Sequence, residues 1–303
     1  MNFTTLLLAA AVTLAVPLIL AALGEAISEN AGVLNIELEG MLLMGAMGGV
    51  LGAWWTGNAG VGYVVGAACS VALGIVHGYV CIGLGANQAV SGVVLNILAL
   101  GVTSYVFATT LGDITSSVAQ VPEFTIPGLS SLPLVGEVLF DHDVGVYLTF
   151  ALVPMVAWVM SRTRVGLAVT AAGEDHASAA ALGIQVNRVR WGALITCGLL
   201  AGAGGAQLSL AGLGFFTPNM TAGRGFIALA AVILASRRAW LVTAALLAFA
   251  TADALSIRAQ ALGIDIPFQL LAMLPYVLTI VALIVFGART RIPSSLGLSY
   301  EED

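Results

Sequence analysis

Apolar runs long enough to cross a lipid bilayer recur along almost the whole of this chain. A spanning helix needs about 20 predominantly apolar residues, and nine runs approach that length: 5–23, 38–56, 61–83, 88–109, 144–161, 191–213, 225–236, 239–257 and 268–287. Hydrophobic residues make up 59% of the chain and charged residues 9%, which is too few charges to cover a soluble surface. We therefore predict one all-α domain over residues 1–303, a polytopic transmembrane helix bundle of about nine spanning helices, or roughly eight to ten. The seventh run, 225–236, is short for a full crossing and predicts a tilted or broken helix.

The distribution of arginine predicts which side of the membrane each loop occupies. All ten basic residues are arginines, at positions 162, 164, 188, 190, 224, 237, 238, 258, 289 and 291. Cytoplasmic loops collect basic residues, so we place the loop 162–190 and the C-terminus in the cytoplasm and the multi-pass chain in the plasma (inner) membrane. The loop 110–143 then lies outside the cell, and it holds five acidic residues and no basic one. Counting back along the crossings places the N-terminus outside as well.

Several classes of activity are excluded or disfavoured by the residues that are missing. The chain has no lysine, so neither a P-loop for ATP nor Schiff-base chemistry is available. No basic patch suits nucleic acid. Cys69, Cys81 and Cys197 lie in apolar runs and are expected to be buried, with no metal-ligand spacing. We expect no catalytic residue, cofactor or metal, and an intramembrane enzyme is disfavoured because no HExxH or GxSxG motif is present.

The segment 24–41 carries polar residues between two apolar runs and has two interpretations. It reads GEAISENAGVLNIELEGM and contains four glutamates, with Asn35 and Glu39 among its polar residues. It is either an interfacial loop whose acids face water or a broken helix lining a translocation pathway, because irregular backbone at membrane depth must face protein or a water-filled cavity. No internal repeat is evident in the sequence.

Three further polar residues lie within apolar runs and are candidates for the same pathway. Asp253 is a default functional candidate, although a packing contact satisfied by a neighbouring donor is an equal alternative. Gln207 follows a glycine-rich run and either lines a pore or bonds a neighbouring helix. Asn96 completes the set of candidates.

The loop 162–190 contains a short helical stretch with an alanine face. Glu174 and Asp175 are expected to open it, since acidic residues favour helix N-termini, and Gly183 is expected to end it. The alanines at 177, 180 and 181 share one face by their spacing. Such a face suits insertion into a groove of another protein; the alternative is a plain loop helix.

Glycine pairs at helical spacing predict close contacts between helices. Gly198 and Gly202 form one GxxxG pair, and Gly62 and Gly66 form another. Small residues at this spacing let two helix backbones approach closely within a membrane.

Taken together, these segments resemble permease subunits of the ABC importer superfamily that carries branched-chain amino acids, simple sugars and nucleosides. The resemblance is closest to the nucleoside branch that works with a basic membrane lipoprotein, and it covers nearly the whole chain in order. The matching motifs are GE…EN-AGV-NI-EGM at 24–41, NQAVSGVVLN at 87–96, TR-G…GE…GI-V at 163–186, AGAGGAQLSL at 201–210, GRGFIALAAVI at 223–233 and ATADAL at 250–255. The chain departs from the family pattern at Asn30, where arginine is usual, at Glu37, where glycine is usual, and at the Ser-Arg-Arg turn 236–238.

The resemblance implies a type II ABC importer-like fold with no catalytic centre of its own. It implies a coupling helix that contacts a cytoplasmic ABC ATPase through Glu174, Asp175, Ala177, Ala180, Ala181 and Gly183. A second permease subunit, forming a heterodimer in the lipid bilayer, and an external solute-binding lipoprotein are the other expected partners. The expected function is ATP-driven import of nucleosides or related small polar solutes such as simple sugars. The alternatives are an ABC permease for branched-chain amino acids and an ion-coupled secondary transporter that uses Asp253 or Glu39.

Overall fold

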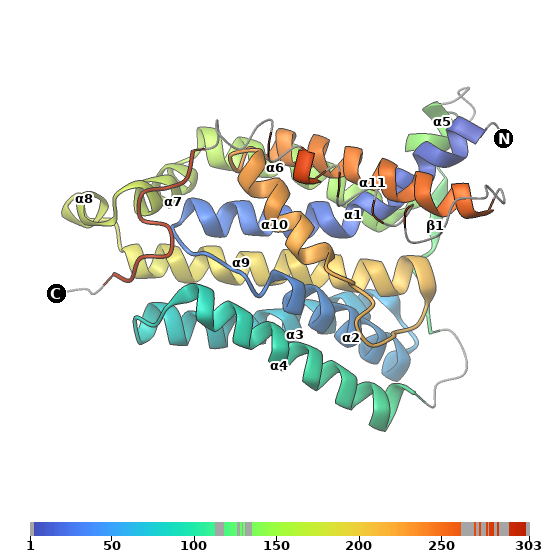
Figure 1. Cartoon of the computed structure of the whole chain (residues 1–303), viewed down its shortest axis with the longest axis horizontal. Coiled ribbons are helices and arrows are strands. Elements are labelled where there is room, and N and C mark those ends of the chain that lie inside the picture. The colour runs from blue at the N-terminus through green and yellow to red at the C-terminus, as the bar shows by residue number, and fades with distance from the viewer. Residues whose placement is uncertain are drawn as a thin grey trace.

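The computed structural model is a bundle of roughly aligned helices with the two ends of the chain at opposite ends of the bundle (Figure 1). The structure describes residues 3–112, 118–125, 128, 130, 135–261 and 291–300, and the single positions 270, 273, 277, 279–281 and 284. Its helices are α1 (Phe3–Asn30), α2 (Leu38–Thr56), α3 (Ala59–Gly78), α4 (Gln88–Val106), α5 (Val135–Leu139), α6 (Val144–Arg162), α7 (Arg164–Glu174), α8 (His176–Ala181), α9 (Val186–Gln207), α10 (Arg224–Leu234) and α11 (Ala239–Ala261). Three π-helical turns extend α3, α4 and α9: η1 (Tyr79–Gly83), η2 (Phe107–Leu111) and η3 (Leu208–Leu213).

Six of the described helical segments are long and apolar enough to cross a membrane. They are Phe3–Asn30, Ala59–Gly83, Gln88–Leu111, Val144–Arg162, Val186–Ala211 and Ala239–Ala259. This confirms the all-α, multi-pass class of the sequence prediction, while the count of about nine spans stays a prediction. The predicted run at 268–287 falls largely outside the described residues.

The first helix continues for seven residues beyond the predicted end at position 23. Glu25 and Glu29 lie within it and are buried. Acidic residues mark the end of a span only when they reach water, and here the neighbouring helices cover them. The charge pattern alone therefore placed this helix end too early.

Two helices begin in the middle of the bundle rather than at one of its ends. The chain leaves α1 at the end that carries α8, returns as the unwound segment 31–37, and starts α2 halfway along (Figure 1). Likewise, the segment 214–223 returns from the opposite end before α10 starts (Figure 1). The short seventh run is thus a broken helix, as predicted.

These two interruptions occur in the same order of elements in both halves of the chain, a similarity that is not evident from the sequence. In each case a long helix, an unwound segment and a shorter helix follow one another: α1, 31–37 and α2, then α9, 214–223 and α10. The two sets run in opposite directions through the bundle (Figure 1). An inverted arrangement of this kind places both unwound segments at a similar depth.

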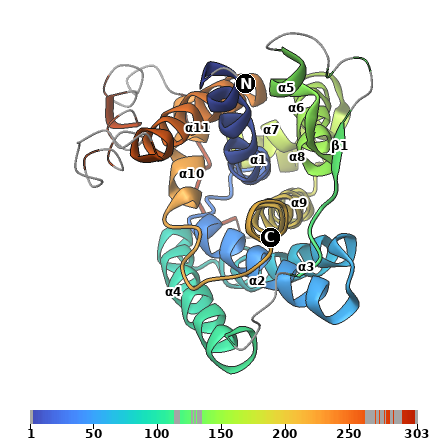
Figure 2. The ribbon, with the colours of Figure 1, turned by 90° about the vertical axis from the view of Figure 1, so that its right-hand side faces the viewer.

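Glycines allow α2, α3 and α9 to pack with their backbones almost touching near the bundle centre (Figure 2). A Cβ added to Gly202 of α9 would lie 2.7 Å from the Cα of Ala67 in α3, and one added to Gly45 of α2 would lie 2.7 Å from the Cα of Gly202. A Cβ at Gly66 would lie 2.5 Å from the carbonyl oxygen of Gly45. The close contacts predicted from the GxxxG pairs are confirmed.

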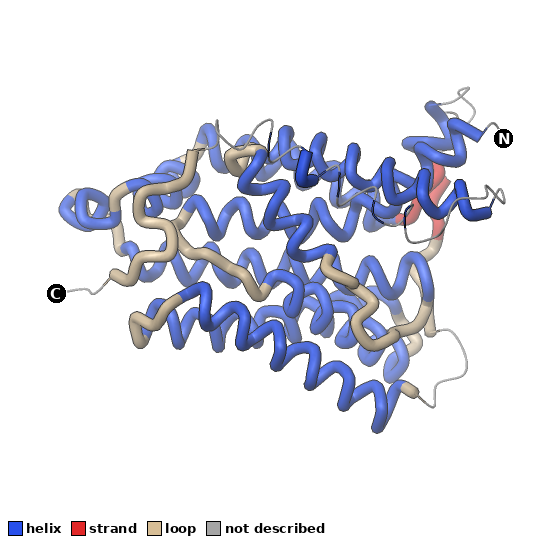
Figure 3. The backbone as a smooth tube through the Cα atoms, in the orientation of Figure 1, coloured by secondary structure: helices blue, strands red, loops and turns tan. Residues whose placement is uncertain are grey.

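The end of the bundle opposite α8 carries a small two-stranded antiparallel sheet (Figure 3). Strand β1 (Glu123–Thr125) pairs antiparallel with β2 (Asp141–Asp143), with Glu123 opposite Asp143. The described part of the predicted loop 110–143 therefore gathers at one end of the molecule, away from α7 and α8.

The glycine contact gives a test of the packing. We expect Gly202→Ala to lower the free energy of unfolding by about 1–3 kcal/mol, because the added methyl has no space against the backbone of α3. Gly192→Ala in the same helix is the matched control: nothing lies within 4 Å of its added Cβ, so higher helix propensity leaves stability equal or slightly greater. Thermal unfolding of the purified protein in one detergent measures both, and an equal effect of the two changes would contradict the packing.

Candidate functional site

Helix α8 projects from one end of the bundle, and α7 connects it to α6 (Figure 1). Thr163 begins α7 by accepting a hydrogen bond from the backbone N–H of Gly166 at 3.2 Å. Asp175 begins α8 by accepting from the N–H groups of Ala177 and Ser178, both at 3.1 Å. The hydroxyl of Ser178, followed by these backbone groups, holds the pKa of Asp175 below its usual range, so the cap stays ionised at neutral pH.

The structure refines the prediction for this segment. Asp175 does open the short helix, whereas Glu174 ends the preceding helix α7. Gly183 follows α8 with a φ of +83°, which confirms the predicted stop, since this left-handed conformation favours glycine.

The predicted alanine face is only partly exposed. Ala177 and Ala181 are exposed, while Ala180 is half-buried against a small apolar cluster. Leu182, which the sequence analysis missed, is 83% exposed beside them. Whether this end of α8 contacts another protein stays a prediction.

The C-terminal segment 291–300 braces α7 and α8 from the bundle side. The N–H of Ser295 donates to the carbonyl oxygen of Gly173 at 2.9 Å, and that of Gly297 donates to the carbonyl of Gly32 at 3.1 Å. The rings of His176 and Tyr300 pack edge to face with centroids 5.2 Å apart. These contacts join α8, the end of α7 and the turn after α1 into one packed unit.

In the middle of the bundle, one carboxylate joins α2 and α10. Glu39 lies in the first turn of α2 and is buried. Its Oε1 accepts from the hydroxyl of Thr221 at 2.6 Å and from the N–H of Gly223 at 2.8 Å, and its Oε2 accepts from the N–H of Gly225 at 2.6 Å. Thus Glu39 satisfies backbone donors at the start of α10, where no intrahelical partner exists.

The charge of Glu39 also suits its position. The N-terminus of a helix carries about half a positive charge, which favours an anion there. Glycine at 225 permits the approach, because an added Cβ would lie 2.5 Å from the backbone nitrogen of Glu39. Gly223 has a φ of +84°, so the GRG run provides the turn as well as the space.

The unwound segment 31–37 is held by side chains from neighbouring helices. Asn96 of α4 donates from Nδ2 to the carbonyl of Ile36 at 2.8 Å and accepts from the N–H of Gly40 at 2.7 Å. The N–H of Leu34 donates to Oε1 of Gln88 at 2.7 Å. Each bond replaces one that a continuous helix would have made.

A buried polar cluster lies against the same segment. The Nδ1 of His77 is 3.1 Å from Oε2 of Glu37, and both side chains are fully buried. The side-chain amide of Asn35 lies 2.8 and 3.1 Å from the carboxylate oxygens of Glu37 and donates to them. The N–H of Asn35 donates to Oε1 of Glu25 at 3.3 Å, which links the cluster to α1.

Gln207 lies at a different place from the residues around 31–40. It donates from Nε2 to both carboxylate oxygens of Asp143 at 3.0 Å and accepts from the hydroxyl of Tyr63. Asp143 in turn caps α6 through the N–H of Val146. This matches the alternative in which Gln207 bonds a neighbouring helix.

Asp253 takes part in an ion pair at the edge of the bundle. Its Oδ2 is 3.3 Å from Nη2 of Arg224, the first residue of α10, and both side chains are partly exposed. The structure therefore brings Asn35, Glu39 and Asn96 together around the unwound segment and leaves Gln207 and Asp253 apart from them. Whether any of the five lines the pathway stays a prediction.

A bundle of apolar spanning helices with two unwound segments held at mid-depth has the architecture of a membrane transport protein, because such backbone is tolerated at that depth only against protein or a water-filled cavity. A sequence model of the family described as "Branched-chain amino acid transport system / permease component" matches residues 7–285. The chain belongs to this family of ABC transporter permeases and is a multi-pass membrane protein.

Three curated relatives align over nearly their whole length. The chain is 38% identical to the putative glucose ABC transporter permease protein TsgC13 of Haloferax volcanii, covering 100% of this chain and 99% of the relative. It is 33% identical to the guanosine ABC transporter permease protein NupQ of Bacillus subtilis, covering 98% and 96%. It is 32% identical to the nucleoside ABC transporter permease protein NupC of Lactococcus lactis, covering 94% and 93%.

The junction at Glu39 generates a stability prediction. We expect Glu39→Gln to lower the free energy of unfolding by about 1.5–3 kcal/mol, because an amide cannot accept the same charge-assisted bonds from Thr221, Gly223 and Gly225. Asp253→Asn is the matched control: it removes a carboxylate from a partly exposed ion pair and is expected to cost at most about 1 kcal/mol. Thermal unfolding in detergent compares them, and equal losses would show that Glu39 is not a special contact.

Proposed function

We propose that the chain is the membrane permease subunit of an ATP-driven ABC importer for nucleosides or related small polar solutes such as simple sugars. The observation that carries the proposal is the full-length similarity to permeases named for guanosine, nucleosides and glucose. Branched-chain amino acids, which the family description names, are the second candidate solute class. Hydrolysis of ATP is assigned to a separate ABC ATPase subunit.

The proposed membrane topology has about nine spans in a type II importer-like arrangement. Six of the proposed spans are the long segments. The other three are α2 and α10, each together with its unwound segment, and the run 268–287. We place the α8 end in the cytoplasm, together with the loop 162–190 and the C-terminus, and the loop 110–143 outside. In support, arginines from α6, α7, α9 and the turn before α11 gather at the α8 end, as the preference of basic residues for the cytoplasm requires.

The proposed partners follow from this orientation. The surface of Ala177, Ala181 and Leu182 contacts the ATPase, with Asp175 fixing the helix that presents it. A second permease subunit completes the translocation pathway as a heterodimer. An external lipoprotein delivers the solute to the end that carries the β1–β2 sheet.

A physical route connects the proposed ATPase contact with the middle of the membrane. Gly173 at the end of α7 packs directly on the carbonyl of Asn30 and is bound through Ser295. After Asn30 the chain continues through the segment 31–37 into α2. There, Glu39 accepts the hydrogen bonds from the start of α10. Closure of the ATPase pair can therefore bias the positions of α2 and α10 through packed backbone, which is how a soluble event shifts a membrane equilibrium.

The ATPase contact is tested by placing a charge on its apolar residue. We expect Leu182→Asp to weaken co-purification of the ATPase at least about 30-fold, because a carboxylate would be buried in an apolar interface. Solute-stimulated ATP hydrolysis should fall with it, while membrane insertion stays normal. Ile292→Asp is the control, since it makes the same change at another exposed position of the α8 end. Normal hydrolysis by the Leu182 variant would reject the proposed contact.

The solute is tested with the complete transporter in liposomes. We expect guanosine and other nucleosides to stimulate ATP hydrolysis and uptake several-fold, glucose to act more weakly, and leucine to have no effect. Stimulation by leucine alone would reassign the chain to amino acid transport. Uptake that follows a proton or sodium gradient and ignores ATP would reject the importer class.

A further inference from the structure

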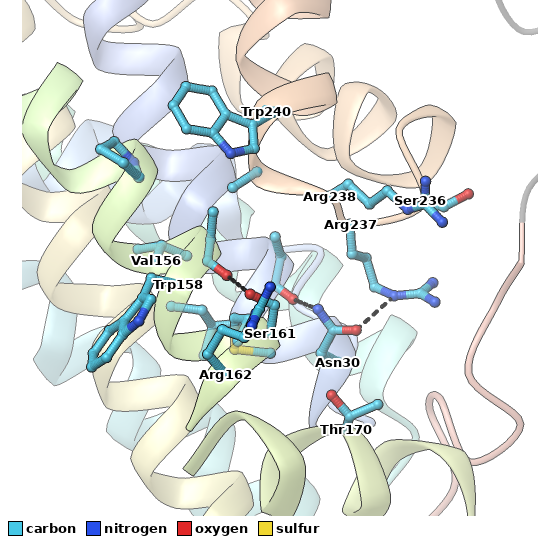
Figure 4. A pocket seen from close by; sticks show the side chains of 16 residues that line it. Asn30, Val156, Trp158, Ser161, Arg162, Thr170, Ser236, Arg237, Arg238 and Trp240 are labelled. Atoms are coloured by element: carbon cyan, nitrogen blue, oxygen red, sulfur yellow. Dashed lines mark hydrogen bonds between the residues drawn. The ribbon is translucent and has the colours of Figure 1, made fainter. Parts of the chain in front are cut away.

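A pocket of about 680 Å³ opens at the α8 end of the bundle, between α6, the end of α1 and the start of α11 (Figure 4). Its described lining includes three arginines, Arg162, Arg237 and Arg238, and no acidic residue, although the carboxylates of Glu29 and Glu174 lie close enough to Arg237 to interact with its charge. We call it the arginine pocket. Side chains of Asn30 and Ser161 also line it, and both donate hydrogen bonds to backbone carbonyls of their own helices, those of Ala26 and Ala157. A pocket with this lining attracts an anion with several acceptor oxygens.

The three arginines differ in how far they are already engaged. Arg237 is anchored: its Nε donates to Oδ1 of Asn30 at 3.1 Å and its Nη1 donates to the carbonyl of Arg291 at 2.6 Å. Arg162 and Arg238 are exposed, and in the described part of the chain neither has a carboxylate oxygen within 4.0 Å. Among the residues that the structure describes, these two guanidinium groups therefore have no carboxylate partner.

The backbone that presents these groups is strained. Ser236 and Arg237 have φ angles of +48° and +62°, a conformation that side chains with a Cβ rarely adopt. The turn is stabilised by the bond from the N–H of Arg237 to the carbonyl of Val232 at 2.9 Å. Strain of this kind is retained where the surroundings impose it, and it often marks a binding site.

The apolar side of the pocket identifies the kind of anion. Trp158 and Trp240 are 61% and 59% exposed and lie on the outer surfaces of α6 and α11 (Figure 4). They stand close to the points where these spanning helices end and begin, the depth at which tryptophan meets lipid headgroups. Met155 and Leu241 continue the exposed apolar surface along the same two helices.

We propose that the arginine pocket binds the phosphate headgroup of an anionic phospholipid from the leaflet at the α8 end. Arg162 and Arg238 bind the phosphate oxygens, and the acyl chains lie along α6 and α11 beside Trp158 and Trp240. Free phosphate shares the headgroup chemistry, but it would leave the exposed aromatic side of the pocket unused. Basic pockets between membrane helices recognise anionic lipids in the same physical way.

The experiment uses the intact transporter, delipidated in detergent and examined by native mass spectrometry. Phosphatidylglycerol and phosphatidylcholine with identical acyl chains are titrated separately. We expect the wild-type protein to retain phosphatidylglycerol at least about tenfold more strongly, and the double change Arg162→Gln with Arg238→Gln to abolish that preference. Arg188→Gln is the control, because it removes an exposed arginine at the same end but outside the pocket, and it should keep the preference.

A second measurement locates the lipid without relying on the arginine variants. Brominated phosphatidylglycerol should quench tryptophan fluorescence more than brominated phosphatidylcholine, and Trp158→Phe with Trp240→Phe should remove the difference. Equal binding of both lipids, equal loss in Arg188→Gln, or displacement of the lipid by millimolar inorganic phosphate would overturn the proposal. So would lipid binding seen only after the ATPase subunit is stripped away, since an acidic segment of that partner would then be the natural occupant.

Discussion

The hydrogen bonds from the start of α10 to the carboxylate of Glu39 are the contact on which the interior of this bundle depends. Two helices begin at mid-depth, and a helix start leaves backbone donors without partners. Lipid tails cannot accept hydrogen bonds, so a helix can begin at that depth only where protein groups or enclosed water accept them. Glu39 does this across the bundle from α2, with glycines at 223 and 225 giving it access. The cost of burying an acid is offset because its partners are fixed, charge-assisted donors.

The residues at which this chain departs from the family pattern interact with specific residues elsewhere in the bundle. Asn30 replaces the usual arginine, and the unusual Ser-Arg-Arg turn supplies Arg237, whose guanidinium bonds to Asn30 from another helix connection. Glu37 replaces the usual glycine and is matched by the buried His77. A guanidinium is therefore retained beside the end of α1, and an added buried acid does not stand alone. The same Ser-Arg-Arg turn builds the arginine pocket.

Polar groups inside the bundle hold irregular backbone in place. Asn96 bonds to both sides of the start of α2, and Gln207 connects the end of α9 to the cap of α6 through Asp143. A pathway shared with a second subunit is consistent with this arrangement, because each chain then needs a rigid wall. The small-residue contacts among α2, α3 and α9 supply that rigidity.

The sequence alone determined the membrane class, most helix positions, the glycine contacts and the capped helix that starts at Asp175. These are local properties: apolar length, residue spacing and capping chemistry are read from neighbours along the chain. It did not determine that α1 runs on past Glu25, that α2 and α10 face each other, or that Leu182 is the exposed large apolar residue of the α8 surface. Those depend on which residues meet across the bundle, such as Glu39 with Gly225 or Glu37 with His77, and partners 40 to about 190 positions apart leave no periodic signal in one sequence. Only the tertiary structure decided which buried charge has a partner, because the energy of a charge in a membrane is set by the groups around it in space.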